Sequence, residues 1–97
     1  MNRGDVYRLI DLEREQQDAK WGPASTDASD HYCMLAILTE EVGEVARALL
    51  ERDMVHMFGE IVQVAAVAVK WLEGIEVDDA SPDEQPDCAI GDQLVAA

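Results

Sequence analysis

Apolar residues recur at steps of three and four between residues 31 and 52, which is the spacing of one face of an α-helix. Ser29 or Asp30, just before this segment, can cap its first turn. The pattern therefore predicts a helix over about residues 31–52 that packs through one apolar face. That face comprises Leu35, Leu38, Val42, Val45 and Leu49.

Another helical pattern precedes this one, from about Val6 to Lys20. Asp5 can cap its start, and Gly22 followed by Pro23 can end it. Its apolar face is short, so it offers less surface for packing than the segment that follows.

A third pattern runs from about Phe58 to Leu72 and stops near Gly74. Its valine-rich centre is also typical of a buried strand. Its length, its alanines and the lack of a second strand candidate favour a helix. Because this helix is apolar on nearly every side, we expect it to be the most buried of the three.

The intervening segments predict one helical domain with an appendage. Residues 22–30 have the composition of a loop, and residues 52–57 form a weaker boundary that suggests a turn. The segment after residue 77 is acidic and contains two prolines, which predicts an extended arm. We therefore expect an all-α domain over residues 1–77 and an acidic C-terminal arm over residues 78–97.

The composition adds a packing problem. The chain has 97 residues, of which 48% are apolar. A chain of this size buries only about 60–65% of its unfolded surface. Self-association could cover the apolar surface that one copy leaves exposed.

The net charge of −14, with only seven Lys and Arg residues, argues against a nucleic-acid partner. Phosphate contacts depend on clustered basic side chains, and the same argument applies to anionic membranes. An anionic ligand would therefore have to bring a cation with it, for which a metal ion is the obvious candidate.

Two further features predict a cytoplasmic protein without a membrane span. The N-terminus lacks the apolar core of a signal peptide, and the apolar run around residues 61–72 is short for a bilayer. Cys33 and Cys88 have no metal-type spacing, so we expect reduced thiols.

Three glutamates interrupt the apolar patterns. Glu41 lies beside the apolar face of the second predicted helix, Glu44 lies one turn further, and Glu60 opens the third helix. Buried carboxylates must be protonated, paired or bound to metal. Arg47 can reach Glu44 but does not neutralise the set. Acids at i and i+3 that face another acid would form an oxygen cage for Mg²⁺, whereas the alternative is a solvated acidic face.

The same residues carry a resemblance. "EEVGE" at 40–44, followed by "EIVQ" at 60–63, resembles the ExxE…ExxD signature of MazG-like, all-α nucleoside triphosphate pyrophosphohydrolases. The phrase "LTEEVGEVARAL" is close to the wording of that family. The resemblance covers roughly residues 5–74.

This resemblance implies antiparallel helices that assemble as dimers or tetramers into four-helix bundles. It implies Mg²⁺, with Mn²⁺ as an alternative ion, held by Glu41, Glu44, Glu60 and the residue at Gln63. The implied reaction cleaves a nucleoside triphosphate, often a non-standard or deoxy form, into a monophosphate and pyrophosphate. Glu41 and Glu44 would be the catalytic acids that orient or deprotonate water.

The chain departs from the family pattern at Gln63, where the signature has Asp. An amide carbonyl can bind Mg²⁺, but it brings no charge and cannot act as a base. Glu40 could compensate in part, although it points further out. The departure puts metal affinity and catalytic rate in doubt rather than the fold.

Four other residues are candidates for substrate binding. Lys70 and Arg47 could hold phosphates. Trp21 could stack on a nucleobase or close the end of its helix as an apolar plug. His31 could touch phosphate or sugar, or have no special role. These four substrate-binding candidates are Trp21, His31, Arg47 and Lys70.

Asp53 and His56 resemble half of a di-iron motif, but they fall in the expected turn and we reject that interpretation. Two function classes remain. The first is a Mg²⁺-dependent nucleotide pyrophosphohydrolase. The second is a non-catalytic helical assembly protein, or nucleotide-binding regulator, with a metal site left incomplete at Gln63.

Overall fold

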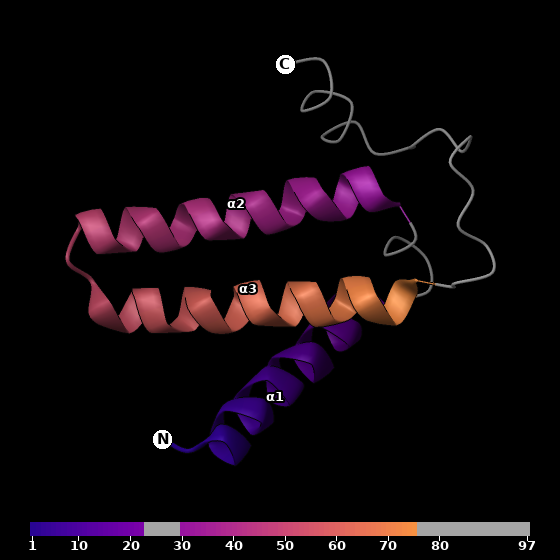
Figure 1. Ribbon diagram of the computed structural model, residues 1–97, viewed down its shortest axis with the longest axis horizontal. Coiled ribbons are helices and arrows are strands. Elements are labelled where there is room, and N and C mark those ends of the chain that lie inside the picture. Colours follow the sequence, from indigo (N-terminus) through magenta and orange to yellow (C-terminus); the bar gives the residue numbers. More distant parts are fainter. Residues whose placement is uncertain (23–29, 76–97) are drawn as a thin grey trace.

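The computed structural model describes residues 1–22 and 30–75, and these residues form helices and no strand (Figure 1). The helices are α1 (Arg3–Trp21), α2 (His31–Leu50) and α3 (Met54–Gly74). The prediction of an all-α fold is confirmed for this part of the chain. Most of the expected loop at 22–30, Cys88 and the expected arm at 78–97 lie outside the described residues.

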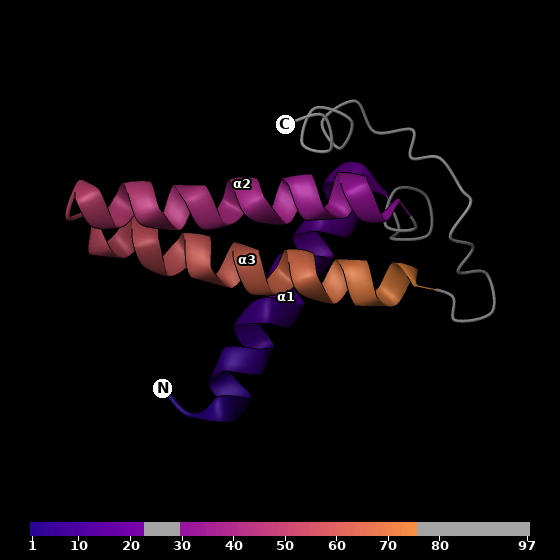
Figure 2. The same cartoon turned by 45° about the horizontal axis from the view of Figure 1, so that its top comes forward.

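α2 and α3 form an antiparallel hairpin, and α1 crosses the hairpin at a steep angle (Figures 1 and 2). α1 packs on α3 but makes no close backbone approach to α2 within the described residues. The hairpin is therefore the scaffold, and α1 covers one part of it.

α1 begins earlier than the sequence pattern predicts. Asn2, not Asp5, is the N-cap: its side chain accepts a hydrogen bond from the Asp5 backbone N–H at 2.9 Å, and the Asp5 carboxylate accepts from the Asn2 backbone N–H at 3.2 Å. This reciprocal arrangement is a capping box, which satisfies two backbone donors at once. α2 starts as expected, because the Asp30 side chain accepts from the Cys33 backbone N–H at 3.1 Å.

α3 also begins about one turn earlier than predicted. Arg52 takes a left-handed backbone conformation with φ of 57°, which ends the connection after α2. Asp53 then caps α3 by accepting from the His56 backbone N–H at 3.0 Å. The polar "RDMVHM" stretch thus contains a turn and a helix start, rather than a turn alone.

The packed face of α2 is rotated from the predicted apolar face, although Leu38 and Val45 belong to both. Leu35, Val42 and Leu49 are about half exposed, at 47%, 50% and 50%. The side chains that face the hairpin core instead follow the spacing Met34, Leu38, Glu41, Val45 and Ala48. Among these, Met34 packs with Val67 of α3. Glu41 therefore stands in the packed face itself, not beside it.

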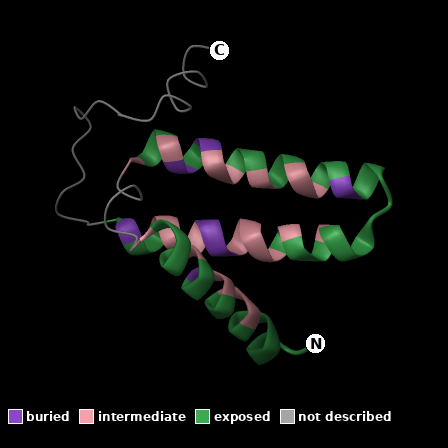
Figure 3. Cartoon of the chain, turned by 180° about the vertical axis from the view of Figure 1, so that it is seen from behind, coloured by how far each residue is buried: buried purple, intermediate pink, exposed green. Residues whose placement is uncertain are grey.

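Much apolar surface remains uncovered within one copy of the chain (Figure 3). Leu50 and Val55 are each 85% exposed, and Phe58 and Ile61 are nearly half exposed. α3 spans 21 residues and is apolar enough to cross a bilayer by length and composition, with only 11% of that stretch buried. The expectation that this apolar segment is too short to cross a bilayer is therefore wrong for the whole helix. Core helices of soluble proteins can, however, be equally long and apolar.

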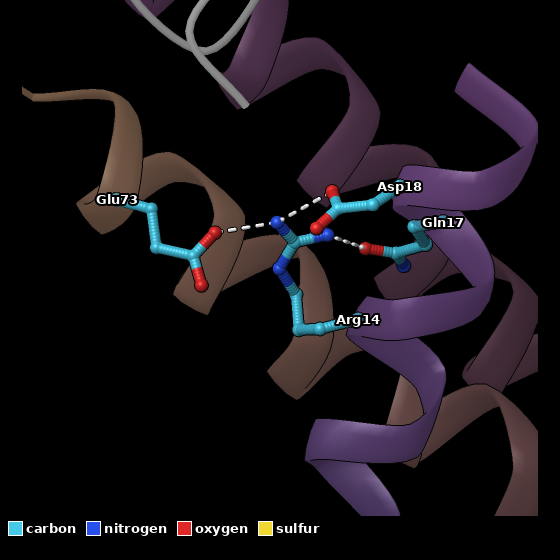
Figure 4. A network of polar contacts seen from close by, with 4 residues as sticks. All are labelled: Arg14, Gln17, Asp18 and Glu73. Carbon is cyan, nitrogen blue, oxygen red and sulfur yellow. Dashed lines mark hydrogen bonds and ion pairs between the residues drawn. The ribbon is translucent and has the colours of Figure 1, made fainter. Parts of the chain in front are cut away.

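A buried arginine fastens α1 to α3 (Figure 4). Arg14 is 4% exposed, and its guanidinium donates to Gln17 and Asp18 on α1 and to Glu73 on α3. Burial alone would lower the pKa of Arg14, but the hydrogen bonds and charges of Glu73 and Asp18 outweigh it and the pKa is raised. Nε of Arg14 is buried without a hydrogen-bond partner among the described residues.

Candidate carboxylate pair and adjoining groove

Glu41 of α2 and Glu60 of α3 meet across the hairpin. Their side chains are close enough for Glu60 to act on the pKa of Glu41, and two carboxyl groups can share a hydrogen bond only when one of them carries a proton. Burial, this hydrogen bond and the negative charges of Glu60, Glu40 and Glu44 raise the pKa of Glu41 to about 7. Glu41 is therefore poised between its protonated and ionised forms at neutral pH.

His56 extends this pair along α3. Its Nε2 lies 3.2 Å from Oε1 of Glu60, one helical turn away, and the Glu60 side chain is only 16% exposed. Glu60 thus stands between an imidazole and a second carboxyl group. Sequence reasoning missed the His56–Glu60 contact, although the i, i+4 spacing could have indicated it once the start of α3 was known.

The four predicted metal ligands are only partly brought together. Glu44 is close enough for its charge to raise the pKa of Glu41, and Gln63 lines the same groove as Glu41. Within residues 1–22 and 30–75, no three His, Cys, Asp or Glu side chains are grouped as a metal cage. The donor chemistry nevertheless fits a hard cation, because carboxylate and amide oxygens are the ligands of Mg²⁺.

A groove of about 540 Å³ opens beside the carboxylate pair. It lies where α1 packs on α3 but leaves α2 uncovered. Four predicted site residues line it, namely Trp21, Glu41, Gln63 and Lys70. The remaining lining residues are Glu13, Gln16, Gln17, Lys20, Cys33, Met34, Ile37 and Val67.

Trp21 is 65% exposed, so it does not act as a buried plug at the end of α1. The Lys20 ammonium lies 4.9 Å from the centroid of the Trp21 ring, a cation–π contact. The structure thereby places an aromatic surface and a cation on the α1 wall of the groove, with Lys70 on the α3 wall.

His31 and Arg47 lie outside the groove lining. His31 Nδ1 accepts a hydrogen bond from Nε1 of Trp71 at 2.9 Å, and the two rings are tilted with centroids 6.0 Å apart. Arg47 Nε lies 3.6 Å from Oε1 of Glu51, and both side chains are exposed. The expected approach of Arg47 to Glu44 is therefore replaced by a surface pair of the kind that contributes little stability.

Apart from Trp21, the α1 wall was absent from the sequence interpretation. Glu13, Gln17 and Lys20 recur at helical spacing just before Trp21, and this spacing is the signal that could have placed them on one face. Their role depends on how α1 crosses α3, which the sequence pattern does not give.

Comparison with known proteins adds no further assignment. The chain matches no protein-family model, no curated protein and no solved structure.

Proposed function

We propose that this chain is a Mg²⁺-dependent nucleoside triphosphate pyrophosphohydrolase of the MazG-like type, with Mn²⁺ as a substitute ion. It cleaves between the α and β phosphates and releases a nucleoside monophosphate and pyrophosphate. The observation that carries the proposal is the Glu41–Glu60 pair on two facing helices, with a raised Glu41 pKa, beside a groove with aromatic and cationic walls. The "EEVGE" and "EIVQ" segments contribute these two acids.

Glu41, Glu44, Glu60 and the Gln63 carbonyl are the residues that would hold the ion. A bound Mg²⁺ supplies charge compensation for the phosphates and lowers the pKa of a water. This compensation matters because the chain carries a net charge of −14. Without a cation, an anionic triphosphate and this acidic groove would repel each other.

The protein side of the reaction follows from the raised pKa of Glu41. A general base works best when its pKa lies near the working pH, and in the metal-free chain that of Glu41 is about 7. An ionised Glu41 Oε accepts the proton of the attacking water, and Glu44, one turn along α2, orients that water. Lys70 reaches the phosphates from the α3 wall, while Trp21 offers its ring to the base.

The working form is a homo-oligomer, a dimer or a tetramer, in which two hairpins form a four-helix bundle. Leu35, Val42 and Leu49 support this, because they repeat every seven residues and are half exposed in one copy. A second hairpin would cover that stripe as helices do in coiled-coil-like bundles. Glu60 and Lys70 are ionisable residues within α3 and disfavour a lipid environment for that helix, so the proposed location is cytoplasmic.

Gln63 favours a second candidate function. With an amide in place of the fourth carboxylate, the chain could bind a nucleotide without cleaving it and serve as an assembly protein or regulator. Such a protein would keep the groove and the bundle but would not turn over its ligand.

Pyrophosphate release separates the two functions. The purified chain is incubated with Mg²⁺ or Mn²⁺ and a panel of ribo-, deoxy- and non-standard nucleoside triphosphates. We expect release from at least one of them, and Glu41→Gln should reduce it by at least about 100-fold because it removes the general base. Glu15→Gln, an equal charge change at an exposed residue of α1 outside the site, should change it little. No release from any nucleotide would favour the regulator.

A further inference from the structure

The buried arginine fixes the orientation of an amide on the groove wall. Arg14 Nη1 donates to Oε1 of Gln17 at 3.1 Å. A guanidinium has no acceptor, so only the oxygen of the Gln17 amide can face it. Figure 4 shows the Gln17 amide nitrogen on the side away from Arg14. Since Gln17 lines the groove, this arrangement leaves its N–H₂ group as the donor available to a ligand.

An acceptor stands one helical turn before this donor. Glu13 also lines the groove and is half-buried. An ionised carboxylate accepts hydrogen bonds through both oxygens and donates none. The wall of α1 therefore presents a two-oxygen acceptor next to an oriented amide donor, with Trp21 two turns further along from Glu13.

Among the nucleobases, one edge complements this pair. Guanine carries two neighbouring donors, N1–H and the N2 amino group, next to the O6 acceptor. Hypoxanthine lacks the N2 amino group. Adenine and cytosine each place an acceptor beside their single amino group, and uracil has one donor between two acceptors. A carboxylate that binds two parallel donors makes the stronger, bidentate contact.

We propose, on the basis of the pyrophosphohydrolase function above, that the α1 wall selects guanine nucleotides. Glu13 accepts from N1–H and N2–H of the base, and Gln17 donates to O6. Arg14 is a positioning residue that acts through Gln17. One face of the Trp21 ring is covered by Lys20, and the base stacks on the other.

The rest of the groove accommodates this orientation. With the base against α1, the phosphates point toward Glu41, Gln63 and Lys70 on the opposite walls. The volume of about 540 Å³ falls within the roughly 300–1,000 Å³ of typical small-ligand pockets. The same groove thus holds both ends of the substrate.

Equilibrium binding of monophosphates tests the base contact without relying on turnover. Calorimetry on the full chain compares GMP, IMP and AMP, each as ribo and deoxy forms. We expect GMP or dGMP to bind at least about tenfold more tightly than the matching inosine nucleotide, as one bidentate base contact discriminates to this degree. Glu13→Gln should bring the two to nearly equal affinity. Glu15→Gln, the same charge change at an exposed residue of α1, should preserve the difference.

Arg14→Lys tests whether Arg14 positions the Gln17 amide. It keeps the positive charge but loses the forked contact with Gln17, so the preference for GMP over AMP should fall severalfold while the helical content is unchanged. Equal binding of all three bases, no binding of any, or an unaltered preference in Glu13→Gln would overturn the guanine proposal. Pyrophosphate release is measured on the same samples to test the hydrolase function separately. Guanine-selective binding without turnover would contradict only the hydrolase function.

Discussion

The two ends of the α2–α3 hairpin have similar apolar sequences but different surroundings. At one end, where α2 begins and α3 finishes, Met34 and Val67 are buried and α1 packs alongside. At the other end, Leu50 and Val55 are each 85% exposed. The covered end adjoins the groove, whereas the open end has apolar surface without a partner in one chain. The hydrophobic pattern of the sequence therefore specifies which helix faces are apolar, but it does not specify what packs against them.

The largest predicted effect is loss of assembly when the exposed stripe is charged. Val42 is 50% exposed at the centre of the stripe. Val42→Glu should turn an oligomer into a monomer, because an unpaired carboxylate inside a packed interface costs several kcal/mol. Light scattering at micromolar concentration measures the change.

Leu12→Glu is the matched control for this substitution, since Leu12 is 44% exposed on α1 and lies outside the stripe. It should leave the assembly intact. A folded wild-type monomer, or equal behaviour of the two variants, would show that the stripe is not an interface.

The next largest effect concerns Arg14, which connects α1 to α3 at the covered end. Arg14→Met removes bonds from a buried guanidinium to Asp18 and Glu73, whose side chains are nearly half exposed and can rehydrate. We expect a loss of about 1–2 kcal/mol in the free energy of unfolding. For a domain of this size, that loss lowers Tm by roughly 5–10 °C.

Arg8→Met tests whether charge alone explains that loss, because Arg8 is exposed on the same helix. Its Tm should stay within about 2 °C of wild type, as surface substitutions commonly do. If both arginine variants melt alike, Arg14 does not fasten α1.

A smaller effect is a pH dependence carried by the carboxylate pair. The pKa of Glu41 rises from its ordinary 4.5 to about 7 on folding. Between these values the folded chain binds more protons than the unfolded chain, so stability falls as pH increases through this window. Below pH 4.5, Glu41 is protonated in both the folded and the unfolded chain and does not lower the free energy of unfolding. Above about pH 7 it lowers that free energy by the full amount. Subtracting the Tm profile of Glu41→Gln from that of wild type isolates this slope, and parallel profiles would contradict it.

Local patterns were sufficient to predict that the described residues form three helices, and they gave Asp30, the observed cap of α2, as one of two candidates. They also predicted that Glu41 and Glu60 approach each other, because each interrupts an apolar face. The start of α3 was missed because "RDMVHM" is polar enough to suggest a loop, while the cap at Asp53 is a single side-chain contact.

The remaining differences depend on tertiary contacts that a sequence pattern does not contain. Arg14 is buried because it meets Glu73, 59 residues away. The packed face of α2 is rotated from the predicted face because that rotation places Met34 against Val67. The groove depends on the angle at which α1 crosses α3, so Glu13 and Gln17 could not be assigned to it beforehand.

The central claim is that the Glu41–Glu60 pair binds a divalent cation, and thermal melts with and without Mg²⁺ test it most directly. Mg²⁺ should raise the Tm of wild type, since a ligand that binds only the folded form stabilises it. Gln63→Asp should melt lower than wild type without Mg²⁺, because it adds a carboxylate beside the others, and should gain more from the ion. Glu41→Gln should melt higher without Mg²⁺ and gain little. If both variants melt like wild type and Mg²⁺ shifts none of the three, the carboxylates are not a metal site.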